Sequence, residues 1–192
     1  MTKLTKDFYL RDDVVQISKD LLGKYLFTKI DGKITAGIIT ETEAYEGITD
    51  KASHAYNNRR TKRTEVMFAE GGISYVYLCY GIHHLFNVVT NVKNVPHAVL
   101  IRAVKPAEGN EMILLRRNAD KMHSRISAGP GTVSQALGIR TEHSGLNLGG
   151  NKIWIEDKGI KVPKENIIAG PRIGVDYAEE DALLPYRFVI NL

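Results

Sequence analysis

The sequence predicts a mixed α/β fold of the α+β type, built as one domain around a largely antiparallel sheet. Its 192 residues match the usual size of one domain. Two tight-turn signals, Asp31-Gly32 and Tyr80-Gly81, each separate two runs that are rich in β-branched and aromatic residues. Hairpins therefore outnumber strand–helix–strand units, which favours antiparallel pairing.

In the first half of the chain we expect a helix and then a hairpin. The helix covers residues 12 to 23, where aspartates stand at the start, apolar residues recur at helical spacing and a glycine ends the pattern. The hairpin covers residues 24 to 45 and turns at Asp31-Gly32. Its second strand carries the stretch ETEAY, which begins at Glu41.

A second hairpin, further strands and two further helices follow. We expect strands within residues 73 to 92 on both sides of Tyr80-Gly81, and a strand that Pro106 closes. We expect the first helix of this half to make its apolar contacts through Met112, Leu114 and Leu115. The remaining expected elements are the strand at 97–106, helices at 107–120 and 128–139, a strand at 152–157 and closing strands within 172–192.

Composition narrows the class of protein. Of the residues, 43% are hydrophobic, enough for a real core, but no run approaches the roughly 18–20 apolar residues of a membrane span. The first residues carry no apolar run of the signal-peptide kind. The single cysteine, Cys79, excludes an internal disulfide and a cysteine-based zinc cage. We therefore expect a reducing, cytoplasmic compartment.

Positive charge is concentrated in one short run. The net charge of +4 is modest, but NNRRTKR, residues 57 to 63, holds four cations and no acid. Such a run forms either a solvated loop or a loop that contacts phosphates. Its position directly after a cluster of acids and aromatics favours the functional reading, and both readings stay open here.

Glu41 and Glu43 lie two positions apart on a predicted strand, so they share a face roughly 6.5–7 Å apart. That separation allows one carboxyl to protonate a leaving group while the other activates water. Alternatively, only one is catalytic and the other is structural, or both belong to a solvated face. A metal site using Glu41, Glu43, Asp50 and His54 is a weaker alternative, because zinc sites usually contain more histidine or cysteine at regular spacing.

Aromatic residues surround these acids in the sequence. Tyr45 follows Glu43, and Tyr75, Tyr77 and Tyr80 lie on the second hairpin. Tyr80 precedes a glycine at the turn, so its side chain either projects from the tip or folds back. An enzyme that acts on a base inside DNA needs a wedge, flat surfaces for the flipped base, and a group that activates water. The acids, the aromatics and the basic run together match these needs.

At this point the chain resembles a known family, the alkyladenine or 3-methyladenine DNA glycosylases. The resemblance covers nearly the whole chain and rests on several separate motifs in the same order. These are ISKDLLGKYL, ETEAYEG, KASHA, GGISYVYLCYGIHHLFNVV, AVLIRAVKP, AGPGTVSQALGI and PRIGVDYAEE followed by LPYRF. The family implies a curved antiparallel sheet flanked by helices, and a protruding hairpin that inserts into DNA.

The resemblance also implies roles for individual residues. Glu43 matches the general base that deprotonates water for attack at C1′ of the deoxyribose. Tyr45, His54 and Tyr77 match the walls that hold the flipped base, and Tyr80 matches the aromatic that intercalates into the vacated space.

Three more residues carry over, and one region departs from the pattern. Asn87 matches an asparagine that crowds the amino group of guanine. Arg102 matches an arginine near the phosphate of the extruded nucleotide, and Arg59 lies where the family places another contact to DNA. Ile82 and His83, after the wedge, stand at positions that vary in the family, so the depth of insertion stays open.

The implied reaction is hydrolysis of the N-glycosidic bond of alkylated or deaminated purines in double-stranded DNA, such as 3-methyladenine, 7-methylguanine, hypoxanthine and ethenoadenine. It requires no metal and no organic cofactor, because water is the nucleophile. No lysine is evidently placed to form an imine, so we expect a monofunctional enzyme that leaves an abasic site. We expect a monomer at the chromosome, in the cytoplasm of a bacterium or the nucleus of a eukaryote. Two other classes remain as alternatives: a damage-binding protein without turnover, and a metal-dependent hydrolase using Glu41, Glu43 and His54.

Overall fold

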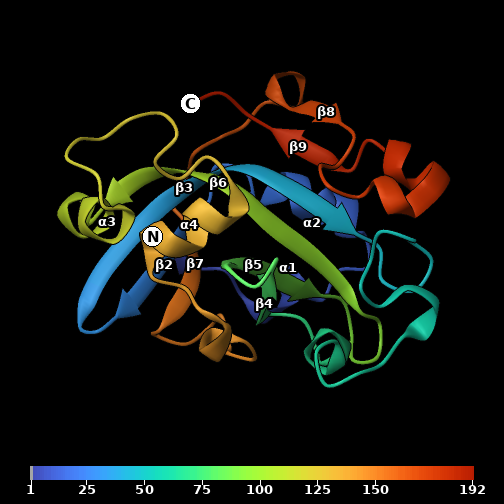
Figure 1. Cartoon of the computed structure of the whole chain (residues 1–192). Coiled ribbons are helices and arrows are strands. Elements are labelled where there is room, and N and C mark those ends of the chain that lie inside the picture. Colours follow the sequence, from blue (N-terminus) through green and yellow to red (C-terminus); the bar gives the residue numbers. More distant parts are fainter. Residues whose placement is uncertain (1) are drawn as a thin grey trace.

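The computed structural model describes residues 2–192, and one curled, nine-stranded sheet organises them (Figure 1). Its strands follow the order β1-β7-β2-β3-β6-β5-β4, while β9 pairs with β3 and β8 pairs with β9. All the pairings are antiparallel, as the hairpin signals predicted. The strands are β1 (Thr2–Lys3), β2 (Tyr25–Ile30), β3 (Lys33–Tyr45), β4 (Ile73–Cys79), β5 (His83–Thr90), β6 (His97–Glu108), β7 (Ile153–Asp157), β8 (Ile168–Gly170) and β9 (Arg187–Val189).

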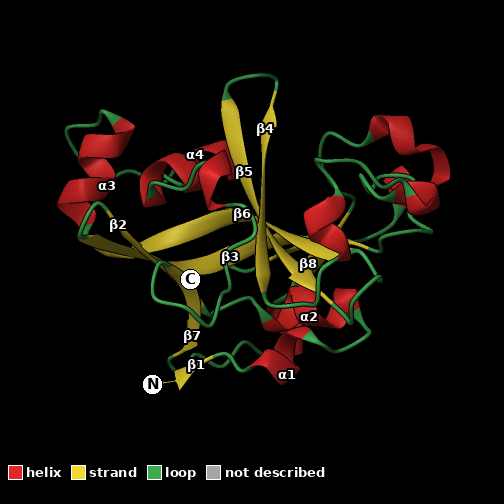
Figure 2. Ribbon diagram, turned by 90° about the horizontal axis from the view of Figure 1, so that it is seen from below, coloured by secondary structure: helices red, strands yellow, loops and turns green. Residues whose placement is uncertain are grey.

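Helices cover both faces of the sheet, with α2 on one face and α4 on the other (Figure 2). Both contribute to the main core, which is built from residues such as Ile17, Phe86 and Leu137. None of the helices in residues 2–192 is long and apolar enough to cross a membrane. The helices are α1 (Lys6–Tyr9), α2 (Val14–Asp20), α3 (Asn110–Arg117) and α4 (Pro130–Leu137), with short 3₁₀ turns η1 (Tyr56–Asn58), η2 (Glu65–Phe68), η3 (Thr141–His143), η4 (Lys164–Asn166) and η5 (Asp176–Leu183).

The hairpin of β4 and β5 projects from the body of the molecule (Figure 2). Tyr80 and Gly81 at its tip have φ angles of 51° and 73°, and the amide of Ile82 donates to the carbonyl of Cys79 over 3.2 Å. Two successive residues with positive φ are what a type I′ turn requires, and this turn matches the twist of antiparallel strands. The predicted turn is therefore confirmed, as is the one at Asp31-Gly32.

Three details differ from expectation. Pro106 does not close β6 but lies inside it, opposite Gly37. The register of β3 and β6 shifts at this point, so the strand continues although proline has no amide hydrogen to donate. In α3 the buried residue is Ile113, which packs with Ile126 and with Ala136 of α4, whereas Leu115 is 72% exposed. The stretch that begins at Arg172 forms a loop and η5 instead of a strand.

The face that Glu41 and Glu43 occupy follows from Thr42 between them. The Thr42 hydroxyl donates to the carbonyl of Ser18 on α2, at 2.9 Å. Since neighbouring residues of a strand point to opposite faces, both glutamates point away from α2, towards the face that α4 covers. The expectation that they share a face is confirmed by this arrangement.

Candidate active site

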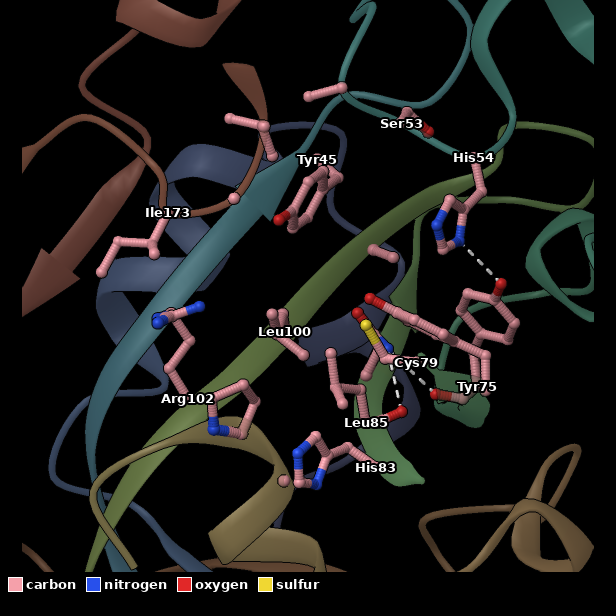
Figure 3. Close-up of a pocket in the computed structure, with 18 of the residues that line it drawn as sticks. Tyr45, Ser53, His54, Tyr75, Cys79, His83, Leu85, Leu100, Arg102 and Ile173 are labelled. Carbon is pink, nitrogen blue, oxygen red and sulfur yellow. Dashed lines mark hydrogen bonds between the residues drawn. The ribbon is translucent and has the colours of Figure 1, made fainter. Parts of the chain in front are cut away.

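A cavity of about 390 Å³ opens between the projecting hairpin, the N-terminal end of α4 and the loops around residues 53 and 174 (Figure 3). Its lining includes the aromatic side chains of Tyr45, His54, Tyr75 and Tyr77. A small, largely aromatic cavity with a few convergent polar groups is the usual form of a site for a flat organic ligand.

Glu43 lies directly behind this cavity and is completely buried. It sits near the end of β3, between β6 and β9. The Tyr45 hydroxyl donates to its Oε2 atom and the amide of Ile173 to its Oε1 atom, both at 2.8 Å. The Nε atom of Arg102 lies 3.4 Å from Oε1. Tyr45, Ile173 and Arg102 all line the cavity, so a ligand there would lie next to the groups that hold Glu43.

Burial raises the pKa of Glu43, and this is the largest influence on it. Arg102, the Ile173 amide and the Tyr45 hydroxyl each lower the pKa, while the nearby charge of Glu41 raises it. The net direction is upward, towards neutral pH. A carboxylate with a raised pKa is, when ionised, a stronger base than an ordinary glutamate.

Glu41 forms the other half of the carboxylate pair and binds two arginines through one oxygen. Its Oε1 atom accepts from Nε of Arg102 at 3.0 Å and from Nε of Arg187 at 2.6 Å. Arg102 is the extra residue of a β-bulge, because Ala103 pairs with Glu41 while Ile101 pairs with the next residue of β3. The bulge directs the Arg102 guanidinium between the two carboxylates.

Tyr45, His54 and Tyr77 are brought together by the fold, from β3, from the loop after it and from β4. The His54 and Tyr77 ring centroids lie 4.6 Å apart in an edge-to-face arrangement. The structure therefore places the three residues predicted as walls around one cavity, although they span 33 positions of sequence.

His54 is held on both ring nitrogens. Its Nδ1 atom lies 2.8 Å from the Tyr75 hydroxyl, and Nη2 of Arg63 lies 3.1 Å from its Nε2 atom. An arginine only donates, so Nε2 accepts and Nδ1 carries the proton. Burial first, and then the charges of Arg63 and Arg59, lower the pKa of His54 to about 4. The ring is therefore neutral at physiological pH.

Asn87 and Tyr80 occupy contrasting positions. Asn87 is 4% exposed and lines the cavity, and its amide nitrogen donates to the carbonyls of Tyr75 and Leu85. Tyr80 is 89% exposed at the hairpin tip, next to Ile82, which is 70% exposed. A large aromatic that is fully solvated in the free protein has the position that a wedge into a base stack needs.

The basic run of residues 57–63 forms an exposed loop beside the cavity, and its arginines differ in their contacts. Arg60 pairs with Glu65 at 2.7 Å, whereas Arg63 contacts His54. Arg59 is exposed and close enough to His54 to lower its pKa. Within residues 2–192, neither Arg59 nor Arg63 lies within ion-pair distance of a carboxylate.

Sequence reasoning missed Arg63, Arg187 and the backbone amide of Ile173 as members of the site. The basic run and the motif PRIGVDYAEE contain two of them, but nothing in either pattern indicates which residue reaches inward. The metal-ligand set of Glu41, Glu43, Asp50 and His54 is not assembled: in the described chain, no three His, Cys, Asp or Glu side chains are grouped as metal ligands. Asp50 is instead paired with buried Arg172.

Comparison with known proteins gives a consistent result. A family model described as methylpurine-DNA glycosylase matches residues 7–192. A Chlamydia felis protein is 50% identical over 190 residues, which cover 98% of this chain and 96% of the relative. A Bacillus cytotoxicus protein is 43% identical, covering 97% and 95%, and a Desulfitobacterium hafniense protein is 40% identical, covering 100% and 96%. The names of all three include 3-methyladenine DNA glycosylase.

Proposed function

The chain belongs to the methylpurine-DNA glycosylase family and is a DNA glycosylase, and on this premise we propose how it works. It flips a damaged purine out of double-stranded DNA and hydrolyses the N-glycosidic bond with a water molecule that Glu43 deprotonates. The observation that carries this proposal is the buried Glu43, hydrogen-bonded on both oxygens, directly behind an aromatic cavity.

Glu43 has room for the water. An ionised carboxylate accepts about four hydrogen bonds, and the Tyr45 hydroxyl and the Ile173 amide account for two of them, while Arg102 lies nearby as an ion-pair partner. A water at a remaining position loses a proton to Glu43 as its oxygen attacks C1′ of the deoxyribose. The bond to the purine breaks, and the purine leaves with the bonding electrons. The product is free purine and an abasic site.

The nature of the lesion explains why one base is sufficient. Alkylation at N3 or N7 makes the purine positively charged, so it leaves without being protonated by the enzyme. Hypoxanthine and ethenoadenine are neutral, so they would leave as anions; their departure depends more on protonation of the leaving purine and on hydrogen bonds to it. No lysine is among the residues that line the cavity in the described chain, which supports a monofunctional enzyme that does not cut the strand.

The other residues hold the DNA. In our proposal Tyr45, His54 and Tyr77 stack on or flank the flipped base, and Asn87 selects among purines by the space it leaves for an amino group. Tyr80 fills the vacated position in the stack, and the stacking energy of its ring offsets part of the cost of unstacking the base.

Two arginines contact the backbone in this proposal. Arg59 meets a phosphate, since its side chain is exposed beside the cavity. Arg102 bonds Glu41 through Nε, and its terminal nitrogens, which bond nothing within residues 2–192, reach the extruded nucleotide. A single lesion needs one site, so we propose that a monomer acts at the chromosome.

The test is base release from a duplex with one hypoxanthine or ethenoadenine, in excess EDTA, with free base and alkali-labile sites both counted. Wild type is expected to release the base, and Glu43→Gln is expected to be slower by about 10²–10⁴-fold. Glu70→Gln, which changes an exposed glutamate that pairs with Lys6 outside the cavity, is the matched control and should match wild type.

Three outcomes would contradict the proposal. Unimpaired release by Glu43→Gln would remove Glu43 from the chemistry. Loss of wild-type activity in EDTA would indicate a metal-dependent hydrolase. Tight binding without release, on methylated DNA as well, would indicate a damage-binding protein.

A further inference from the structure

Two of the aromatic walls have a guanidinium group behind them. Arg63 lies 4.8 Å from the ring centroid of Tyr77, and Arg172 lies 4.8 Å from that of Tyr45. Neither arginine lines the cavity, whereas both tyrosines do. Each ring therefore stands between a fixed positive charge and the space that a base would occupy.

The two arginines differ in whether their charge is compensated. Arg172 is buried and forms a two-point ion pair with Asp50, whose side chain is equally buried. Arg63 has no carboxylate within ion-pair distance in residues 2–192; its polar partner is the neutral His54 ring. Arg63 is thus the uncompensated charge of this wall, and it contacts two wall residues from outside.

An uncompensated cation in this position changes what the wall attracts. The face of a tyrosine ring is negative and attracts cations. A guanidinium on the outer face draws that electron density outward and also repels any cation stacked on the inner face, at a distance below the screening length of about 10 Å. A neutral base of the same shape loses nothing from this repulsion.

We propose that Arg63 is a specificity-determining residue that disfavours positively charged N-alkylated purines relative to neutral damaged purines, without touching the base. The proposal rests on the proposed function, because it concerns a base held in this cavity. Arg63 then sets the balance between two lesion classes, since the electron-rich walls favour cationic bases and Arg63 opposes that preference.

The test compares two bases of the same shape and different charge. Duplexes carry either 7-methylguanine, which is cationic, or 7-methyl-7-deazaguanine, in which carbon replaces N7 and the charge is absent. A 2′-fluoro substituent on both sugars prevents base loss, and all proteins carry Glu43→Gln, so that only binding is measured. The readout is the ratio of the two Kd values.

Arg63→Met is expected to shift this ratio by about tenfold in favour of the cationic base, the size expected for removing one partly screened charge at this distance. Arg63→Lys keeps the charge and should leave the ratio close to that of the parent protein, which carries only Glu43→Gln. Lys62 belongs to the same loop and, within residues 2–192, forms neither a cation–π contact with Tyr77 nor a hydrogen bond to His54. Lys62→Met should therefore weaken binding to both duplexes equally.

The contrary results are distinct. An equal loss of affinity for both duplexes in Arg63→Met would show that Arg63 contacts a phosphate, and would overturn the inference. An unchanged ratio with unchanged affinities would overturn it as well, while leaving the proposed function intact. If the parent protein binds neither lesion better than undamaged DNA, the proposed function itself fails, and this inference with it.

Discussion

The hydroxyl of Tyr45 donates a hydrogen bond to Oε2 of Glu43 over 2.8 Å. The two residues lie two positions apart on β3, so their side chains leave the same face of the strand. Tyr45 lines the cavity whereas Glu43 lies behind it. The wall that a base would contact and the carboxylate that would activate water are therefore one hydrogen-bonded unit.

The unit predicts a pH effect. Glu43 must be ionised to act as a base, so activity rises as pH rises through its raised pKa. Tyr45→Phe removes a hydrogen bond to the ionised form, which raises the pKa of Glu43 further. We expect the acid limb of kcat/KM for hypoxanthine release to move upward by about one pH unit, since bonds to charged groups are worth about 1.5–3 kcal/mol. An acid limb at the same pH in both proteins would show that Tyr45 does not influence the base.

Burial of Glu43 also predicts a stability effect. Because the pKa of Glu43 is higher in the folded protein, the ionised form costs folding free energy at every pH above the unfolded pKa of a glutamate. Glu43→Gln is therefore expected to be at least as stable as wild type at pH 7. The advantage should fade as pH falls through the folded and then the unfolded pKa. Urea unfolding at pH 7 and pH 4 measures it, and a large loss of stability in the variant at pH 7 would contradict the expectation.

Glu41 predicts a positioning effect on Arg102. Glu41→Gln removes the charge that holds Arg102 and Arg187, so we expect base release to slow by about tenfold, within the loss of 0.5–3 kcal/mol seen for coupled contacts. The double variant Glu41→Gln with Arg102→Met shows whether Glu41 affects the rate by positioning Arg102. If Glu41 works through Arg102, the double variant is no slower than Arg102→Met alone; independent, multiplying losses would exclude that role.

We expect substitutions of Tyr80 to weaken DNA binding without lowering the stability of the protein. Its side chain is 89% exposed, so Tyr80→Ala should change the free energy of unfolding by no more than about 0.5 kcal/mol. Tyr80→Gly should be slightly stabilising, since φ at this position is 51°. Both variants are expected to bind lesion-containing duplex at least tenfold more weakly, because the unstacked position is left empty. Fluorescence anisotropy with a labelled duplex gives the affinity, and unaltered affinity would exclude Tyr80 as the wedge.

Local chemistry made much of the fold predictable. Both hairpin turns need positive φ at two successive residues; Asp31-Gly32 is a pair favoured there, whereas at Tyr80-Gly81 only the glycine is. Asp13 caps α2 through the amide of Gln16, and Pro130 begins α4, as helix-start rules expect. The antiparallel α+β class and the family followed from such signals and from the ordered motifs.

The errors occurred where packing overrode local pattern. Pro106 was expected to end a strand, but a register shift opposite it let β6 continue. Leu115 was expected to pack inward, but Ile113 is the residue that α3 buries. Neither outcome depends on neighbours in sequence, because a register shift and the face of a helix are set by the elements they pack against.

The sequence by itself determined the family, the two hairpins and the residue types of the site, since turns, caps and motifs are local. Only the tertiary structure decided how the site is connected. The Ile173 amide reaches Glu43 across 130 positions, Arg187 reaches Glu41 across 146, and Arg63 turns towards His54 while its neighbour Arg60 turns towards Glu65. These contacts depend on which strands pair and on which direction each loop takes, and such long-range geometry is the result of burying the whole core at once.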